Sequence, residues 1–158
     1  TDLCPGVSSI HHLDSAVAWA EELELKLVLD LHGAPGSQNG QQTSGWHNPQ
    51  WTAADFDEDA AVEVIANVSR RYAGSPAVIA VEVLNEPELP ARTLLRYYKR
   101  AYTAVRANGM GADRVAVVVN IFLMYELATQ ARARRAPPHD LAALRRPLAP
   151  SPTSRRRP

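Results

Sequence analysis

The residues best suited to chemistry stand where two apolar runs of the sequence end. The stretch AVEVLNEPELP, at 80–90, stops on Asn85 and Glu86, and Pro87 keeps the run from continuing. The earlier run KLVLDLH, at 26–32, stops on His32. A carboxyl group such as that of Glu86 can protonate a leaving oxygen if a partly apolar site raises its pKa towards neutrality. Asn85 and His32 can hydrogen-bond hydroxyl groups, so these side chains are typical of a site that holds a sugar.

A long loop follows the first of these runs. Residues 33–51, GAPGSQNGQQTSGWHNPQW, contain four glycines and two prolines. Loops of this length in compact domains are usually functional or disordered. Its tryptophans, Trp46 and Trp51, can stack an indole face on the C–H face of a pyranose, and Asn39 is a further candidate for contact with the substrate. The alternative is that two loop tryptophans pack locally.

Apolar periodicity predicts three helices that alternate with three strands. The expected helices cover residues 12–23, 55–73 and 91–108, and the expected strands cover residues 26–32, 77–84 and 114–120. Residues 122–131 are expected to start a further helix. Asp55, followed by Glu58 three residues later, is a capping-box signal for the second helix. This alternation predicts a parallel sheet covered by helices, which fits either a doubly wound sheet or a (β/α)8 barrel.

The two faces of each predicted strand distinguish these folds. In the first strand Leu27, Leu29 and Leu31 share one face, and the other face carries Val28, Asp30 and His32. In the second strand the apolar face is Ile79, Val81 and Val83, and the other carries Ala80, Glu82, Leu84 and Glu86. A doubly wound sheet would bury both faces under helices, whereas a barrel can pair polar side chains inside it near the mouth. A barrel is therefore favoured, with Asp30 and Glu82 as interior hydrogen-bonding groups rather than catalytic ones.

The chain joins two different compositions near Leu127. Residues 1–127 carry 9 Lys and Arg against 16 Asp and Glu, whereas residues 128–158 carry 8 Arg and a single acid, Asp140. We expect a partial α/β barrel domain over 1–127, because a full barrel needs roughly 250 residues and eight strands. We expect a disordered Arg- and Pro-rich tail over 128–158. Clustered arginines would also suit a nucleic-acid-binding arm, but a truncated or frame-shifted end is the favoured interpretation, so no nucleic-acid partner is predicted.

Composition limits the remaining possibilities. No apolar stretch reaches the roughly 18 to 20 residues of a membrane span, so no membrane partner is expected. The single cysteine, Cys4, excludes an internal disulfide. The chain does not begin with Met, and it shows no charged-then-apolar leader segment, so neither localisation nor oligomeric state follows from the sequence.

Taken together, these stretches resemble glycoside hydrolase family five, the cellulase-like (β/α)8 clan. They are most similar to its exo-β-1,3-glucanase and β-glucosidase branch, through LVLDLHGAPGSQNG at 28–40 and the apolar run ending in Asn-Glu-Pro at 85–87. The resemblance covers roughly residues 5–125. The two motifs together are specific, whereas either alone would be weak.

The resemblance implies retaining hydrolysis of β-glucosides or β-1,3-glucans without a metal or organic cofactor. It implies that Glu86 is the acid/base, and that Asn85 and His32 contact the substrate. The family's strand-two arginine, its His-x-Tyr segment and its nucleophilic glutamate have no counterpart that can be assigned here, so the chain alone is expected to be inactive. The alternatives are a non-catalytic β-glucan-binding remnant and a non-functional truncated product.

Overall fold

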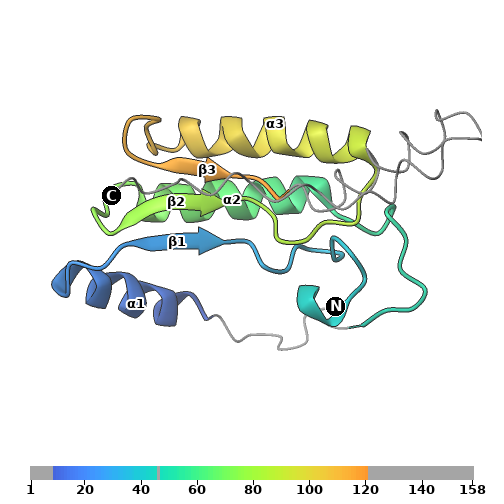
Figure 1. Ribbon diagram of the computed structural model, residues 1–158, viewed down its shortest axis with the longest axis horizontal. Helices are drawn as coiled ribbons and strands as arrows, with labels where there is room; N and C mark the ends of the chain where they lie inside the picture. The colour runs from blue at the N-terminus through green and yellow to red at the C-terminus, as the bar shows by residue number, and fades with distance from the viewer. Residues whose placement is uncertain (1–8, 46, 121–158) are drawn as a thin grey trace, which may run out of the picture. The chain divides into compact units, whose positions relative to one another are not determined.

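The computed structural model describes residues 9–45 and 47–120. Helices and strands alternate along this part of the chain (Figure 1). The helices are α1 (Ile10–Glu22), α2 (Glu58–Tyr72) and α3 (Ala91–Ala107), with a short 3-10 turn, η1 (Gln42–Ser44), in the long loop. The strands are β1 (Leu27–Asp30), β2 (Val78–Glu82) and β3 (Ala116–Val118). The order of elements confirms the predicted alternation, although β2 ends at Glu82 and β3 is shorter than expected.

The three strands form one parallel sheet in the order β1-β2-β3. Asp30 is in register with Glu82, and Glu82 is in register with Val118. Each strand reaches the next through a helix, which is the βαβ arrangement that parallel pairing requires. Three parallel strands with flanking helices make up a partial (β/α)8 barrel, as the sequence predicts.

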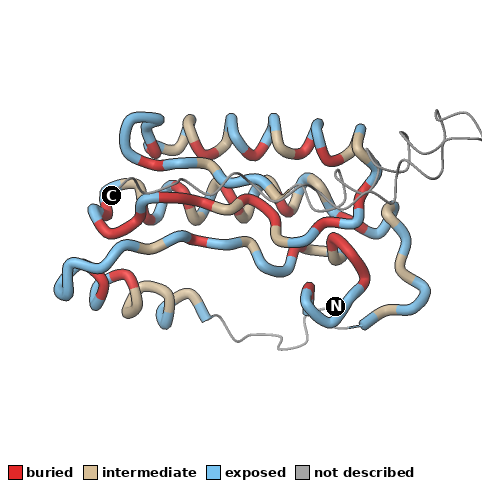
Figure 2. The backbone as a smooth tube through the Cα atoms, in the orientation of Figure 1, coloured by how far each residue is buried: buried red, intermediate tan, exposed pale blue. Residues whose placement is uncertain are grey.

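The two faces of the sheet are unequally covered. Leu29 and Val81 are 6% and 1% exposed, and they line an apolar cavity of about 170 Å³ together with Ile65 of α2. Val28, one residue from Leu29, is 54% exposed. Figure 2 shows this change from buried to exposed along β1. The predicted division of β1 into a helix-covered face and an open face is therefore confirmed.

The prediction that Ile79 shares the covered face with Val81 is wrong. The register shifts between Leu27 and Val28, so that Leu27 pairs with Val78 and Val28 pairs with Ala80. Ile79 falls between these pairs and is 42% exposed, whereas Val78 is completely buried. A one-residue irregularity of this kind interrupts the alternation of faces on which the prediction depended.

Two kinds of polar contact stabilise α2 and α3: a capping hydrogen bond at the start of α2, and ion pairs between the two helices. The cap of α2 is Asp57, whose carboxylate accepts a hydrogen bond from the Ala60 N–H at 3.0 Å. The predicted cap, Asp55, instead accepts from the backbone N–H and hydroxyl of Thr52. Glu58 accepts from the guanidinium groups of Arg96 and Arg100, which joins the start of α2 to α3. The two helices therefore meet along one side of the sheet.

Several predictions fall on residues outside the described part of the chain. These are the tail at 128–158, the helix at 122–131 and the position of Trp46. Within residues 9–45 and 47–120, no helix has the length and apolarity needed to cross a membrane. In the same residues, no group of three or more His, Cys, Asp or Glu side chains could hold a metal ion.

Candidate active site at the carboxyl ends of the strands

The strand ends that precede His32 and Asn85 lie side by side because β1 and β2 are parallel. Beyond the ladder, the Leu31 N–H donates to the Glu82 carbonyl at 3.0 Å, and the Asn85 N–H donates to the Leu31 carbonyl at 3.1 Å. These bonds carry the alignment of β1 and β2 past the ends of the strands. They bring the backbone before His32 next to the backbone of Asn85, as the sequence predicts.

His32 is paired with the last residue of β1. Its Nδ1 lies 2.8 Å from Oδ2 of Asp30. A carboxylate only accepts hydrogen bonds, so Nδ1 of His32 is the donor and carries the proton. The bond to Asp30 fixes the orientation of the imidazole ring. The His32 side chain is 64% exposed and that of Asp30 only 30%. The imidazole is therefore oriented by the protein while its outer part remains accessible.

Glu82 lies beside this pair on β2. Burial raises the pKa of its carboxyl, and the negative charge of Asp30 raises it further. A hydrogen bond from the Asn120 side chain lowers the pKa of Glu82, and so does the charge of His32. The Tyr98 hydroxyl donates to the backbone carbonyl of Asn120, and burial raises the pKa of Tyr98 to about 12. The three strands thus contribute a connected set of polar groups to the open face of the sheet.

Glu86 has an unusual backbone conformation. Its φ angle is +41°, a left-handed value that costs free energy for any residue with a Cβ atom. The side chain is exposed, and the next residue, Pro87, is fully buried. The Asn39 Nδ2 donates to the Glu86 carbonyl at 2.9 Å. The strained turn is therefore held in place by the long loop.

Asn39 is nearly buried, at 3% exposed. Besides the Glu86 carbonyl, its Nδ2 donates to the Thr43 hydroxyl at 3.3 Å, and its Oδ1 accepts from the Gln41 N–H at 2.9 Å. Its amide is thus engaged by protein groups on both sides. This differs from the exposed placement that direct contact with a sugar would need.

Sequence reasoning missed Gln38. The side chain is completely buried, and its Nε2 donates to the carbonyls of His32 and Asn85, each at 2.8 Å. Its Oε1 accepts from the Ala34 N–H at 3.0 Å, and its carbonyl accepts from the Glu88 N–H at 3.0 Å. The available signal was a pair of adjacent amide residues in a glycine-rich loop, which periodicity cannot assign to a buried position.

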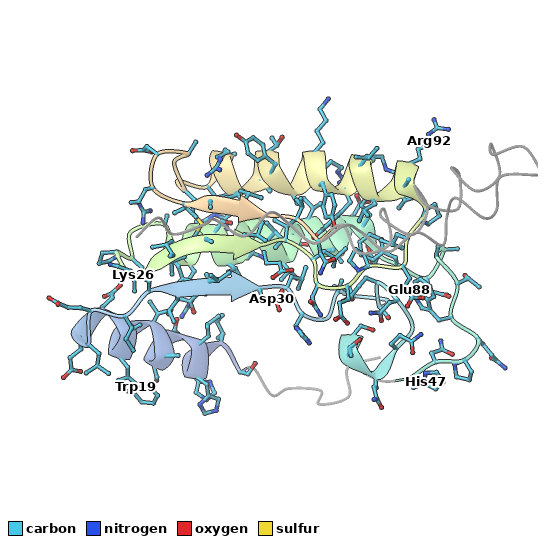
Figure 3. The ribbon with its side chains drawn as sticks, in the orientation of Figure 1. Trp19, Lys26, Asp30, His47, Glu88 and Arg92 are labelled. Carbon is cyan, nitrogen blue, oxygen red and sulfur yellow. The ribbon has the colours of Figure 1, made fainter. Side chains whose placement is uncertain are left out.

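The loop and the turn after β2 enclose a groove of about 560 Å³. Side chains bearing amides, a hydroxyl, an imidazole and carboxylates line it: Asn39, Gln41, Gln42, Thr43, His47, Glu86 and Glu88. Figure 3 shows Asp30 at the end of β1, with Glu88 and His47 farther out on the same side. The groove therefore includes the carboxyl of Glu86, and most of the other side chains that line it are of types that can bond to hydroxyls.

Trp51 anchors the loop. Its Nε1 donates to the carbonyls of Gly36 and Ser37, at 3.1 and 3.2 Å. A Cβ added at Gly40 would stand 2.6 Å from the Trp51 Cβ, so the backbone of the loop passes close against this side chain. The local-packing alternative therefore describes Trp51 better than stacking on a sugar does.

The chain is similar to proteins of fungi and yeasts over roughly two thirds of its length. It is 43% identical over 102 residues to "Probable glucan 1,3-beta-glucosidase A" of Aspergillus niger, covering 61% of this chain and 24% of that protein. The corresponding protein of Emericella nidulans is 40% identical over 104 residues, covering 63% and 26%. "Glucan 1,3-beta-glucosidase" of Lachancea kluyveri is 35% identical over 120 residues, covering 72% and 27%. The chain thus spans about a quarter of the length of the curated relatives it matches.

A solved structure supports the fold. Endo-glycoceramidase II from Rhodococcus sp., in a cellobiose-like isofagomine complex, matches 75% of this chain and 38% of its own chain, with a TM-score of 0.53 and 20% identity. At that identity the likeness concerns the fold alone. The family model for cellulase (glycosyl hydrolase family 5) matches residues 4–133, and the chain accordingly belongs to glycosyl hydrolase family 5.

Proposed function

We propose that this chain carries the acid/base side of a retaining glycosidase site that acts on β-glucosides or β-1,3-linked glucans. One observation carries the proposal. Glu86 follows Asn85 in the turn after β2, where the buried Gln38 side chain bonds to the carbonyls of both Asn85 and His32, and Glu86 lines a groove of polar side chains. In barrels of this kind the reacting groups lie at this end of the strands. The names of the similar fungal proteins supply the class of substrate.

The proposed chemistry assigns Glu86 two roles. It donates its proton to the glycosidic oxygen as the bond to the anomeric carbon breaks, while a second carboxylate attacks that carbon. It then removes a proton from the water that releases the sugar. Asn85 and His32 bind hydroxyls of the substrate, and Trp46 provides a stacking surface.

No residue of this chain is assigned as the second carboxylate. Asp30 bonds to His32 and Glu82 interacts with Asn120, so both are engaged in orienting neighbours. Glu88 lies only two residues from Glu86 on the same turn. We therefore expect no measurable turnover of aryl β-glucosides by the 158-residue chain alone, because acid assistance by itself contributes only about 10² to 10⁴ in rate.

A non-catalytic role in binding β-glucan is the second candidate, favoured by the amide-lined groove. Titration of the 158-residue chain with β-1,3-linked glucose oligomers, followed by tryptophan fluorescence, measures such binding directly. Saturable binding without hydrolysis in any completed barrel would support the second candidate over the first.

Hydrolysis is tested in a graft that completes the barrel. The 102 residues of this chain that match the Aspergillus niger relative replace their counterparts there. We expect hydrolysis of β-1,3-linked oligomers, with the β anomer as the first product seen by NMR. Glu86→Gln should lower the rate by about 10² to 10⁴, whereas the control Glu88→Gln, two residues away on the same groove, should retain most of it. Equal losses in both variants would contradict the proposal.

A further inference from the structure

We infer that Gln38 and Asn39 are positioning residues for Glu86, which hold its backbone so that its carboxyl meets the leaving oxygen. This inference rests on the proposed function, because it concerns the residue proposed there as the acid. It also changes the interpretation of Asn39 from a contact with the substrate to a contact with the catalytic turn.

The first observation is the correspondence between two consecutive amides and two consecutive carbonyls. Gln38 Nε2 donates to the Asn85 carbonyl at 2.8 Å, and Asn39 Nδ2 donates to the Glu86 carbonyl at 2.9 Å. A third bond, from the Glu88 N–H to the Gln38 carbonyl at 3.0 Å, lies on the far side of Pro87. The turn 85–88 is therefore held at three places by two adjacent residues, although about 47 residues separate the partners in sequence.

The second observation is that both amides are fully employed inside the protein. Gln38 is completely buried, and its two N–H groups are used by the carbonyls of Asn85 and His32. An amide nitrogen has two hydrogens to donate. The side-chain nitrogen of Asn39 donates to the Glu86 carbonyl and to the Thr43 hydroxyl, and Asn39 is only 3% exposed. These side chains act on the site through its backbone.

The third observation is the conformation that is being held. Glu86 has φ +41°, which a chain adopts for a residue other than glycine only when the surroundings impose it. The Asn39 bond is made to the carbonyl of this same residue. Rotation out of the left-handed region would change the direction of the Glu86 side chain relative to the groove that it lines. Small displacements of a reacting group can cost about 10²-fold in rate.

Gln38 also ties the turn to the neighbouring strand. The same Nε2 that holds Asn85 also donates to the carbonyl of His32. Because His32 is oriented by Asp30 at the end of β1, one buried amide sets the spacing between the two strand ends that face the substrate. Loss of either amide should therefore slow proton transfer from Glu86, because each amide holds the backbone of the turn that carries this carboxyl.

The experiment uses the graft described above, with two β-glucosides of different leaving groups. An alkyl leaving group requires protonation, whereas 2,4-dinitrophenolate leaves without it. If Asn39 positions the acid, Asn39→Ala should lower kcat/KM for the alkyl glucoside by about 10- to 100-fold, and that for the dinitrophenyl glucoside by less than about 3-fold. A general loss of structure would reduce both rates equally.

Isosteric variants guard against misfolding. Asn39→Asp keeps the acceptor for Gln41 but loses the donor to Glu86, and Gln38→Glu likewise keeps the acceptor for Ala34. Both should show the same selective loss on the alkyl glucoside. Asn48→Ala is the matched control, because Asn48 belongs to the same loop and its side chain accepts from Gln50 rather than contacting the turn after β2.

Glu86→Gln separates failure of this inference from failure of the proposed function. Selective loss in Glu86→Gln, with equal loss on both substrates in the Asn39 and Gln38 variants, would overturn the inference and leave the proposed function standing. No selectivity in Glu86→Gln itself would overturn the proposed function. Selective loss in all of these variants, with Asn48→Ala unchanged, is the expected result.

Discussion

The two faces of the sheet show how this chain separates stability from chemistry. Leu29 lies under α2 and is 6% exposed, whereas its neighbour Val28 is 54% exposed. Asp30 and Glu82, in register across β1 and β2, interact on the open face together with His32. Polar groups that would be costly beneath the helices are tolerated where no helix covers them. The covered face therefore holds the fold together, and the open face is available for a site.

The largest expected effect tests this division with neighbouring residues. Leu29→Ala should lower the free energy of unfolding by about 2 to 5 kcal/mol, because it removes buried methyl groups beside an existing cavity. Val28→Ala should change it by about 0.5 kcal/mol or less, since that side chain is largely exposed. Chemical denaturation of the two variants measures both values. Similar losses would show that the open face is also packed.

A smaller effect is expected at the ion pairs between α2 and α3. The guanidinium of Arg96 lowers the pKa of Glu58 below its ordinary value of 4.5, and Arg100 acts in the same direction. Because the folded pKa is depressed, this stabilisation is present above pH 4.5 and is lost as pH falls through the folded pKa. Glu58→Gln should cost about 1 kcal/mol at pH 7 and much less in acid. Thermal unfolding at several pH values tests this.

Glu82 on the open face should respond to pH in the opposite direction. Burial and the charge of Asp30 raise its pKa above 4.5. A raised carboxyl pKa means that the folded chain binds the proton more tightly than the unfolded chain does. The free energy of unfolding therefore falls as pH rises from 4.5 through the folded pKa, and this loss is absent below pH 4.5. Glu82→Gln should therefore raise the free energy of unfolding at pH 7, by less than about 1 kcal/mol. Destabilisation at pH 7 that persists in acid would mean that Glu82 acts mainly through its hydrogen bonds.

The smallest change concerns association rather than folding. Ile79 and Val28 leave exposed apolar surface on a three-stranded sheet, and Trp19 on α1 is 63% exposed. Exposed apolar patches beside strand edges favour aggregation. Ile79→Thr should lower light scattering of the 158-residue chain at a given concentration, with little effect on the unfolding midpoint. Unchanged scattering would locate the associating surface elsewhere.

Much of this arrangement was predictable from local pattern. The alternation of elements and the faces of β1 follow from hydrophobic periodicity, which the structure retains where strands are regular. Ile79 departs from the pattern because the register shifts beside it. The role of Gln38 was not predictable, since its partners lie on segments that meet only when β1 and β2 pair. The cap of α2 was also not predictable from spacing alone. The loop places Asp57 at the start of the helix, whereas Asp55 bonds to Thr52.

The most direct test of the account is azide rescue of Glu86→Gln in the graft with an activated β-glucoside. Azide attacks the glycosyl-enzyme without needing a base to remove a proton, so it bypasses a missing acid/base residue. Two successive inversions at the anomeric carbon then retain the configuration. We predict that azide increases turnover and that the product is the β-glucosyl azide. An α-glucosyl azide would make Glu86 the nucleophile, and absence of any rescue would contradict its role as the acid/base.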